Sequence, residues 1–225
     1  MISSHSCVLN ALLIAAAVCG SATPAAAQRA QPDSVVHSSA AAIAKARADS
    51  ARYPYTAADI HFMSGMIAHH SQAIVMSGLV PSRGATSSVR TLAERIINAQ
   101  QDEIVTMQTW LRDRQQAVPE ASATGMKMVM NGMEHEMLMP GMLTAGQMTQ
   151  LERAMGAEFD RLFLTFMIQH HRGATSMVND LFGSYGAGQD ELVFKFASDV
   201  NVDQSTEIAR MERMLATFGP ETRAP

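Results

Sequence analysis

The sequence predicts an all-α protein, a four-helix bundle built from two duplicated helical hairpins with a methionine-rich connector between them. Three observations lead to this fold class. Helix-favouring residues dominate, with 18 methionines and only 5% aromatic residues among the 225. One unusual motif occurs twice, and each copy is followed by the same short pattern, E-I-x-x-M. A repeat of this kind indicates an internal duplication, which decides how the rest of the chain is interpreted.

The repeated motif is rich in histidine and methionine. Asp59–Met76 reads DIHFMSGMIAHHSQAIVM and Asp160–Met177 reads DRLFLTFMIQHHRGATSM, so the copies align without a gap. The E-I-x-x-M pattern starts at Glu103 after the first copy and at Glu207 after the second. Since neither hairpin can bury its apolar face alone, the two copies are expected to pack into one bundle.

The N-terminal residues resemble an export signal. Residues 8–18 form an apolar run, and an A-x-A site predicts cleavage after Ala27, which makes residues 1–27 a signal peptide. The run is too short for a stable membrane span. Both cysteines, Cys7 and Cys19, fall inside the signal, as suits a mature chain in the periplasm or outside the cell. Residues 28–54, rich in Ala and Ser, are expected to be a flexible segment.

Repeat one is predicted to span residues 55–118. Thr56 and Asp59 form a capping-box pattern, so the first helix should start there and end near residues 77–79. Residues 81–84 form a loop, and apolar residues at helical spacing predict a second helix over residues 87–116. Pro119 ends it.

The connector covers residues 119–143, and repeat two covers residues 144–219. Thr144 and Gln147 form a second capping box, and Gly156 is expected to break the helix that follows them. The third long helix is predicted over residues 157–182 and the fourth over 190–217, before the helix-stop pair Gly219-Pro220.

The motif offers soft and borderline metal ligands. Thioether sulfur and imidazole nitrogen together suit Cu(I), with Cu(II) accepted at the histidines, whereas Zn(II) and Ca(II) prefer other ligand sets. On a helix, residues three and four apart share a face. The candidate ligands are therefore Met63, Met66, His69, His70 and Met76 in copy one, and Met167, His170, His171 and Met177 in copy two.

Further methionines extend this candidate set. The helices that follow the motifs carry Met107, Met211 and Met214. The connector carries Met126, Met128, Met130, Met133, His135 and Met137 without a helical period. It either binds a soft ion or forms a hydrophobic lid over the bundle, and the sequence leaves both interpretations open.

The doubled F-x-x-x-M-I-x-H-H-x-x-A-x-x-M and E-I-x-x-M patterns resemble the domain of unknown function 305 family of exported bacterial proteins, which includes copper-binding, CopM-like members. The resemblance covers residues 55–219. It implies a ferritin-like four-helix bundle that binds copper, or silver, through the His and Met residues of both copies. The chain departs from the family pattern at Leu164, in place of a methionine, and at Gly173.

These observations predict an exported, non-enzymatic copper-binding protein that acts in metal sequestration, resistance or transfer. Its partners would be the metal ion and other periplasmic copper proteins or an efflux system, and the sequence leaves a homo-oligomer open. The formal charge of -4, without a basic run, argues against nucleic acid. Two alternatives remain: a ferritin-like metal-dependent oxidase, and a structural helical module whose methionines only pack the core.

Overall fold

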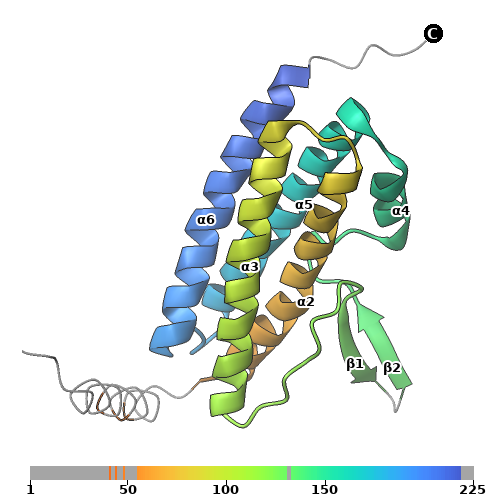
Figure 1. Ribbon diagram of the computed structural model, residues 1–225. Helices are drawn as coiled ribbons and strands as arrows, with labels where there is room; N and C mark the ends of the chain where they lie inside the picture. Colours follow the sequence, from red (N-terminus) through yellow and green to blue (C-terminus); the bar gives the residue numbers. More distant parts are fainter. Residues whose placement is uncertain (1–40, 42–43, 45–47, 49–54, 131–132, 219–225) are drawn as a thin grey trace, which may run out of the picture. The chain divides into compact units, whose positions relative to one another are not determined.

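The structure is a computed structural model that describes residues 41, 44, 48, 55–130 and 133–218 (Figure 1). All of the elements below belong to the unit formed by residues 43–225. The predicted signal peptide and nearly all of the segment 28–54 lie outside the described residues.

Four long helices form the bundle that the sequence predicts. They are α2 (Ala57–Leu79), α3 (Ser87–Asp113), α5 (Gly156–Gly183) and α6 (Glu191–Leu215). α2 packs against α3 and α5 against α6, so each repeat is a hairpin, and the two motif helices α2 and α5 pack against each other (Figure 1). The predicted four-helix bundle is confirmed. The two motif helices form the junction between its halves.

Both predicted capping boxes are present. The Thr56 side chain accepts the backbone N–H of Asp59, whose carboxylate accepts the N–H of Thr56, and Thr144 and Gln147 make the same exchange at α4 (Ala145–Arg153). Gly156, with φ of 56°, separates α4 from α5 as predicted. α3 ends at Asp113, three residues before the predicted end, and Gln115 then takes a φ of 56°.

The connector contains a β-hairpin, which the all-α prediction did not include. β1 (Met126–Met130) pairs antiparallel with β2 (Met133–Met137), and Met128 lies opposite His135 in the register. The sequence signal was an alternating M-K-M-V-M, an Asn-Gly pair and M-E-H-E-M, since Asn-Gly favours two-residue hairpin turns. The high methionine content, unusual for a strand, hid this alternation.

An aspartate near the start of α2 and another near the start of α5 tie each hairpin to the loop of the other. Asp59 Oδ1 accepts the backbone N–H of Gly188, 2.7 Å away, from the α5–α6 loop. Asp160 Oδ2 accepts that of Thr86, 3.0 Å away, from the α2–α3 loop. These carboxylates, which an oxidase interpretation needs as iron ligands, instead hold the duplicated hairpins together.

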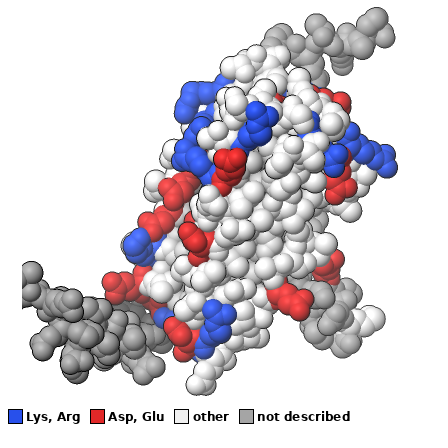
Figure 2. Space-filling view, viewed as in Figure 1, with Lys and Arg blue, Asp and Glu red and all other residues white. Residues whose placement is uncertain are grey.

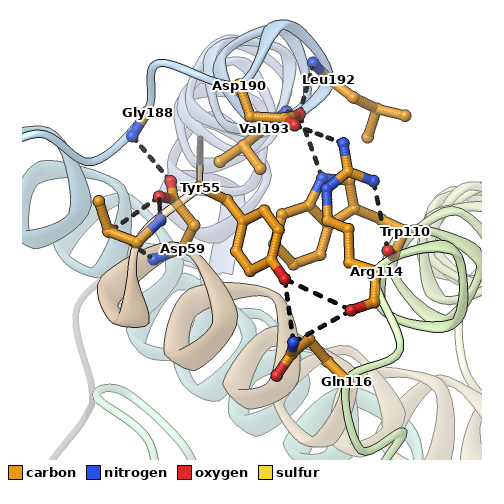
Figure 3. A network of polar contacts seen from close by, with 10 residues as sticks. Tyr55, Asp59, Trp110, Arg114, Gln116, Gly188, Asp190, Leu192 and Val193 are labelled. Carbon is orange, nitrogen blue, oxygen red and sulfur yellow. Dashed lines mark hydrogen bonds and ion pairs between the residues drawn. The ribbon is translucent and has the colours of Figure 1, made fainter. Parts of the chain in front are cut away.

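A polar and aromatic network joins the end of α3 to the start of α6 (Figure 3). Asp190 caps α6 by accepting the N–H groups of Leu192 and Val193, and it also accepts the indole N–H of Trp110 at 3.1 Å. Arg114 pairs with Asp190, and its guanidinium lies 4.4 Å from the centre of the Trp110 ring. The buried Asp190 carboxylate therefore caps α6, pairs with Arg114 and accepts the hydrogen bond from Trp110.

None of the described helices is long and apolar enough to cross a membrane. On the face drawn in Figure 2, acidic and basic side chains lie scattered around a wide uncharged area.

Replacing Asp190 with alanine should lower the free energy of unfolding by about 3 kcal/mol or more, because the change removes a helix cap and leaves Arg114 without its buried partner. Urea denaturation measures the loss. Asp199→Ala is the matched control, since it breaks an exposed ion pair with Lys195 and should cost at most about 0.5 kcal/mol. Equal losses in the two variants would contradict the role given to Asp190.

Candidate metal centre

The motif helices bring all of the primary candidate ligands into the interior. Each has a relative exposure of 7% or less. These residues are Met63, Met66, His69, His70, Met76, Met167, His170, His171 and Met177. α2 is buried on most of its surface, because α3, α5, α4 and β1 all contact it. His69 and His70 on this helix have no access to bulk water, so their hydrogen-bond partners become decisive.

The His69 and His170 rings pack against each other at a tilt where α2 meets α5. Their ring centroids are 3.8 Å apart at an interplanar angle of 39°. Burial, reinforced by the neighbouring His70, lowers the pKa of His69 to about 3. Burial, reinforced by His69, lowers the pKa of His170 well below its usual value. Both central rings are therefore neutral at neutral pH, which is the form that binds metal ions.

His69 has one nitrogen committed and one without a partner. Its Nε2 lies 3.0 Å from the carbonyl oxygen of Pro140. Because a carbonyl only accepts, Nε2 carries the proton and Nδ1 has the lone pair. That Nδ1 is buried without a hydrogen-bond partner, as are both ring nitrogens of His170.

The outer histidines pair with carboxylates from the second helix of each hairpin. His171 Nε2 lies 2.7 Å from Glu207 Oε2 on α6. In repeat one, His70 Nε2 approaches Glu103 Oε2 on α3 to 2.6 Å, at an angle poor for a hydrogen bond. The Nδ1 atoms of both histidines are buried without a partner. A histidine whose far nitrogen contacts a carboxylate is a frequent arrangement among metal ligands.

The pairing of Glu103 with His70 and of Glu207 with His171 was not predicted from the sequence. The available signal was the repeat itself, since both residues open an E-I-x-x-M pattern. The same repeat contains Gln100 and Gln204, one helical turn earlier, which the sequence analysis also missed. Both are buried, and the side-chain oxygen of each is without a hydrogen-bond partner.

The methionines divide between two core clusters, and each cluster draws on both repeats. Met66 groups with Met63, Met107 and Met177, while Met167 groups with Met76 and Met211. The last methionine of each motif therefore packs in the cluster of the other motif: Met76 with Met167, and Met177 with Met66. This exchange follows because α2 and α5 run antiparallel, so the end of one motif lies beside the start of the other.

Of the further candidates, Met107 and Met211 are buried and Met214 is partly buried in the second cluster. Met126 packs against the first cluster, whereas Met133 and Met137 are exposed. The side chains of Met128, Met130 and His135 lie outside the described part of the chain. The structure adds Met139 and Met142, both buried in the first cluster.

The residues present fit a soft or borderline ion better than a hard one. Among the described residues, no three His, Cys, Asp or Glu side chains are grouped closely enough to hold a metal. The donors that lie together are imidazole nitrogens with free lone pairs and thioether sulfurs. Both donor types suit Cu(I). A buried acceptor without a partner costs about 1–3 kcal/mol, which a bound ion would offset.

The comparison with protein families gives one match. The family described as "Domain of unknown function (DUF305)" matches residues 59–215, which contain both motifs and both E-I-x-x-M segments. No curated protein matches the chain.

Solved structures of similar proteins share the fold. A putative secreted DUF305 protein from Streptomyces coelicolor is 29% identical, with 75% of this chain and 98% of that chain covered and a TM-score of 0.60. CopM in its Cu(II)-bound form is 26% identical, with 71% and 97% covered and a TM-score of 0.55. CopM in its Cu(I)-bound form is 25% identical, with 72% and 98% covered and a TM-score of 0.54.

The metal-free protein should lose stability as the pH falls through the range in which exposed histidines titrate. The unfolded chain takes up protons on His69 and His170 near pH 6.5, whereas the folded chain does so only at much lower pH. Stability is therefore full above about pH 6.5 and declines toward pH 3, at a slope approaching about 1.4 kcal/mol per pH unit for each ring.

Urea midpoints measured between pH 7.5 and pH 5 test this expectation, in a range where most carboxylates remain ionised. The double variant His69→Gln/His170→Gln should show a shallower pH dependence than the unmodified protein, whatever its absolute stability. His61→Gln is the control, because His61 is exposed on the same helix. An unchanged slope in the double variant would contradict the burial of neutral rings.

Proposed function

The chain belongs to the DUF305 family, and from this premise we propose that it is an exported copper-binding protein that holds Cu(I), and also Cu(II) or Ag(I), through buried His and Met side chains. The observation that carries the proposal is the set of buried imidazole lone pairs without a protein partner, beside two methionine clusters. CopM, which shares the fold, has been solved in Cu(I)- and Cu(II)-bound forms. These donors match those that copper prefers.

The residues divide into two roles. Met66 and Met167, with the methionines clustered around them, would supply thioethers to Cu(I). His70 and His171 would supply Nδ1, with Glu103 and Glu207 holding the rings and keeping the proton on Nε2. The central pair, His69 and His170, would bind through its unpartnered ring nitrogens.

A binding role is better supported than an oxidase. A di-iron centre in a helical bundle needs glutamates and E-x-x-H motifs on facing helices, and this sequence contains no E-x-x-H. Asp59 and Asp160, two of the four carboxylates available for such a centre, cap the loops of the opposite hairpin instead. We therefore propose sequestration, resistance or transfer of the ion without catalysis.

The predicted signal peptide places this activity in the periplasm or outside the cell. Thiolates oxidise in such compartments, whereas thioethers and imidazoles remain available as copper ligands. Neutral thioethers also release Cu(I) readily. The partners of the protein would then be other periplasmic copper proteins or an efflux system.

The first test titrates the mature protein with Cu(I) against a competing chelator, and separately with Cu(II) and Zn(II). Cu(I) should bind more tightly than micromolar and Zn(II) more weakly than copper, because thioethers are poor zinc ligands. The double variant Met66→Leu/Met167→Leu should weaken Cu(I) binding at nearly constant core volume, while the exposed Met155→Leu should not. A protein without sub-micromolar copper affinity would leave only the structural module.

A second test concerns the carboxylates. Glu103→Gln/Glu207→Gln should weaken Cu(II) binding by about 10–100-fold, the usual cost of losing a partner that orients a ligating histidine. Cu(I) binding, which depends more on thioethers, should change less. Isothermal titration calorimetry with both ions separates these effects, with the partly exposed Glu212→Gln as a control on α6. Equal losses for both ions would argue against distinct His and Met roles.

A further inference from the structure

A short segment of the connector contacts both motif helices and lies against His69. This segment, residues 139–143, is called the strap below. Gln72 on α2 donates to the Leu143 carbonyl at 3.0 Å and accepts its N–H at 2.6 Å. His69 Nε2 contacts the Pro140 carbonyl, and Gln169 on α5 donates to that of Gly141 at 3.2 Å. The strap is therefore held by α2 and α5 together.

Two glycines on the motif helices make room for the strap. A Cβ atom at Gly173 would lie 1.9 Å from the Pro140 carbonyl oxygen, and one at Gly65 would lie 2.9 Å from Met139 Sδ. The first of these contacts is with backbone and cannot be relieved by a side-chain rotation. The departure of Gly173 from the family pattern thus has a structural reason, because any larger residue would displace the strap.

The strap covers one half of the duplicated bundle, and its contacts have no counterpart in the other half among the residues that the structure describes. In the aligned motifs, Gly65 corresponds to Phe166 and Gly173 corresponds to Gln72. A phenylalanine therefore fills the position at which Met139 packs in the first half. Leu164 likewise replaces Met63, so the second half loses a sulfur at the same level.

Thioethers accumulate beneath the strap as a result. The cluster there holds six buried methionines, Met63, Met66, Met107, Met139, Met142 and Met177, against three in the other cluster, Met76, Met167 and Met211. Met139 Sδ and Met177 Cε converge on Gly65, at 2.9 and 3.3 Å from the position of its absent Cβ. A methionine from the strap and one from α5 therefore meet against α2 at Gly65, and Met66 of α2 belongs to the same buried cluster. Flexible methionine specifies a core poorly, so such a concentration is unusual for packing alone.

We propose that the strap is a thioether-bearing lid: Met139 is a ligand of a soft-ion site that exists only in the half of the bundle beneath it, with Met66 and Met177 as its partners. This inference rests on the proposed copper-binding function and names the stronger Cu(I) site within it. The three side chains are almost fully buried. The strap must therefore lift from His69 and Gln72 before an ion enters or leaves.

The first experiment compares Cu(I) affinity, by chelator competition, in the unmodified protein, Met139→Leu and the exposed control Met155→Leu. Met139→Leu should weaken the tightest site by at least about tenfold, the lower end of what even a supporting contact costs a metal site. Met155→Leu should bind like the unmodified protein. If the unmodified protein binds no Cu(I), the proposed function fails. If the unmodified protein and Met139→Leu bind Cu(I) equally well, Met139 is not a ligand and only the lid proposal is overturned.

A second experiment displaces the strap from the motif helices without replacing any methionine. Gly173→Ala places a methyl group against the Pro140 carbonyl, so it should weaken Cu(I) binding as Met139→Leu does and speed release of Ag(I). Labelled methionine methyl groups, followed by NMR, report on the strap directly in the unmodified protein. The Met139 methyl signal should shift on addition of one equivalent of Ag(I). A Met139 signal that stays in place at saturation would overturn the proposal, whether or not Gly173→Ala folds.

Discussion

The burial of two imidazoles in contact, His69 and His170, is the interaction on which the rest of the bundle depends. They lie where α2 meets α5, so the junction between the repeats is built around polar rings. Such a junction is stable only if the rings stay neutral, and burial ensures this by lowering the pKa of both. Neutral rings without enough protein partners leave lone pairs in a dry interior, which is a cost unless a ligand satisfies them.

Duplication explains how the surroundings of these rings are organised. Since α2 and α5 run antiparallel, each histidine pair is flanked by the start of its own motif and the end of the other. Met66 therefore groups with Met177, although Met76 belongs to its own motif. The aspartates follow the same rule, because each caps the loop of the opposite hairpin. Neither repeat can complete its half alone, so binding and folding depend on the same interface.

The sequence predicted what local patterns specify and missed what tertiary contacts decide. Capping boxes at Thr56 and Thr144 located two helix starts, because their chemistry involves neighbouring residues alone. The His70–Glu103 and His171–Glu207 pairs join separate helices, so no spacing within one helix reveals them. The β-hairpin was readable from its alternation and its Asn-Gly pair, and was missed because methionine is not a typical strand residue. The placement of the strap depends on Gly65 and Gly173, both of which lie far from it in the sequence.

The strap makes the two halves of the duplicated bundle chemically different. Two identical halves would bind two ions equally and release them together. Here Gly65 and Gly173 make room for the strap. At the positions that correspond to Gly65 and Met63, the second motif has Phe166 and Leu164, both buried in the other cluster. The half beneath the strap contains more buried methionines, and the strap covers it. On the copper-binding proposal, this half should hold Cu(I) more tightly and exchange it more slowly. The other half keeps its histidine and glutamate pair with fewer thioethers, which suits a weaker and faster site. If the protein binds copper as proposed, loss of symmetry after duplication would separate a retaining site from an exchanging one within a single bundle.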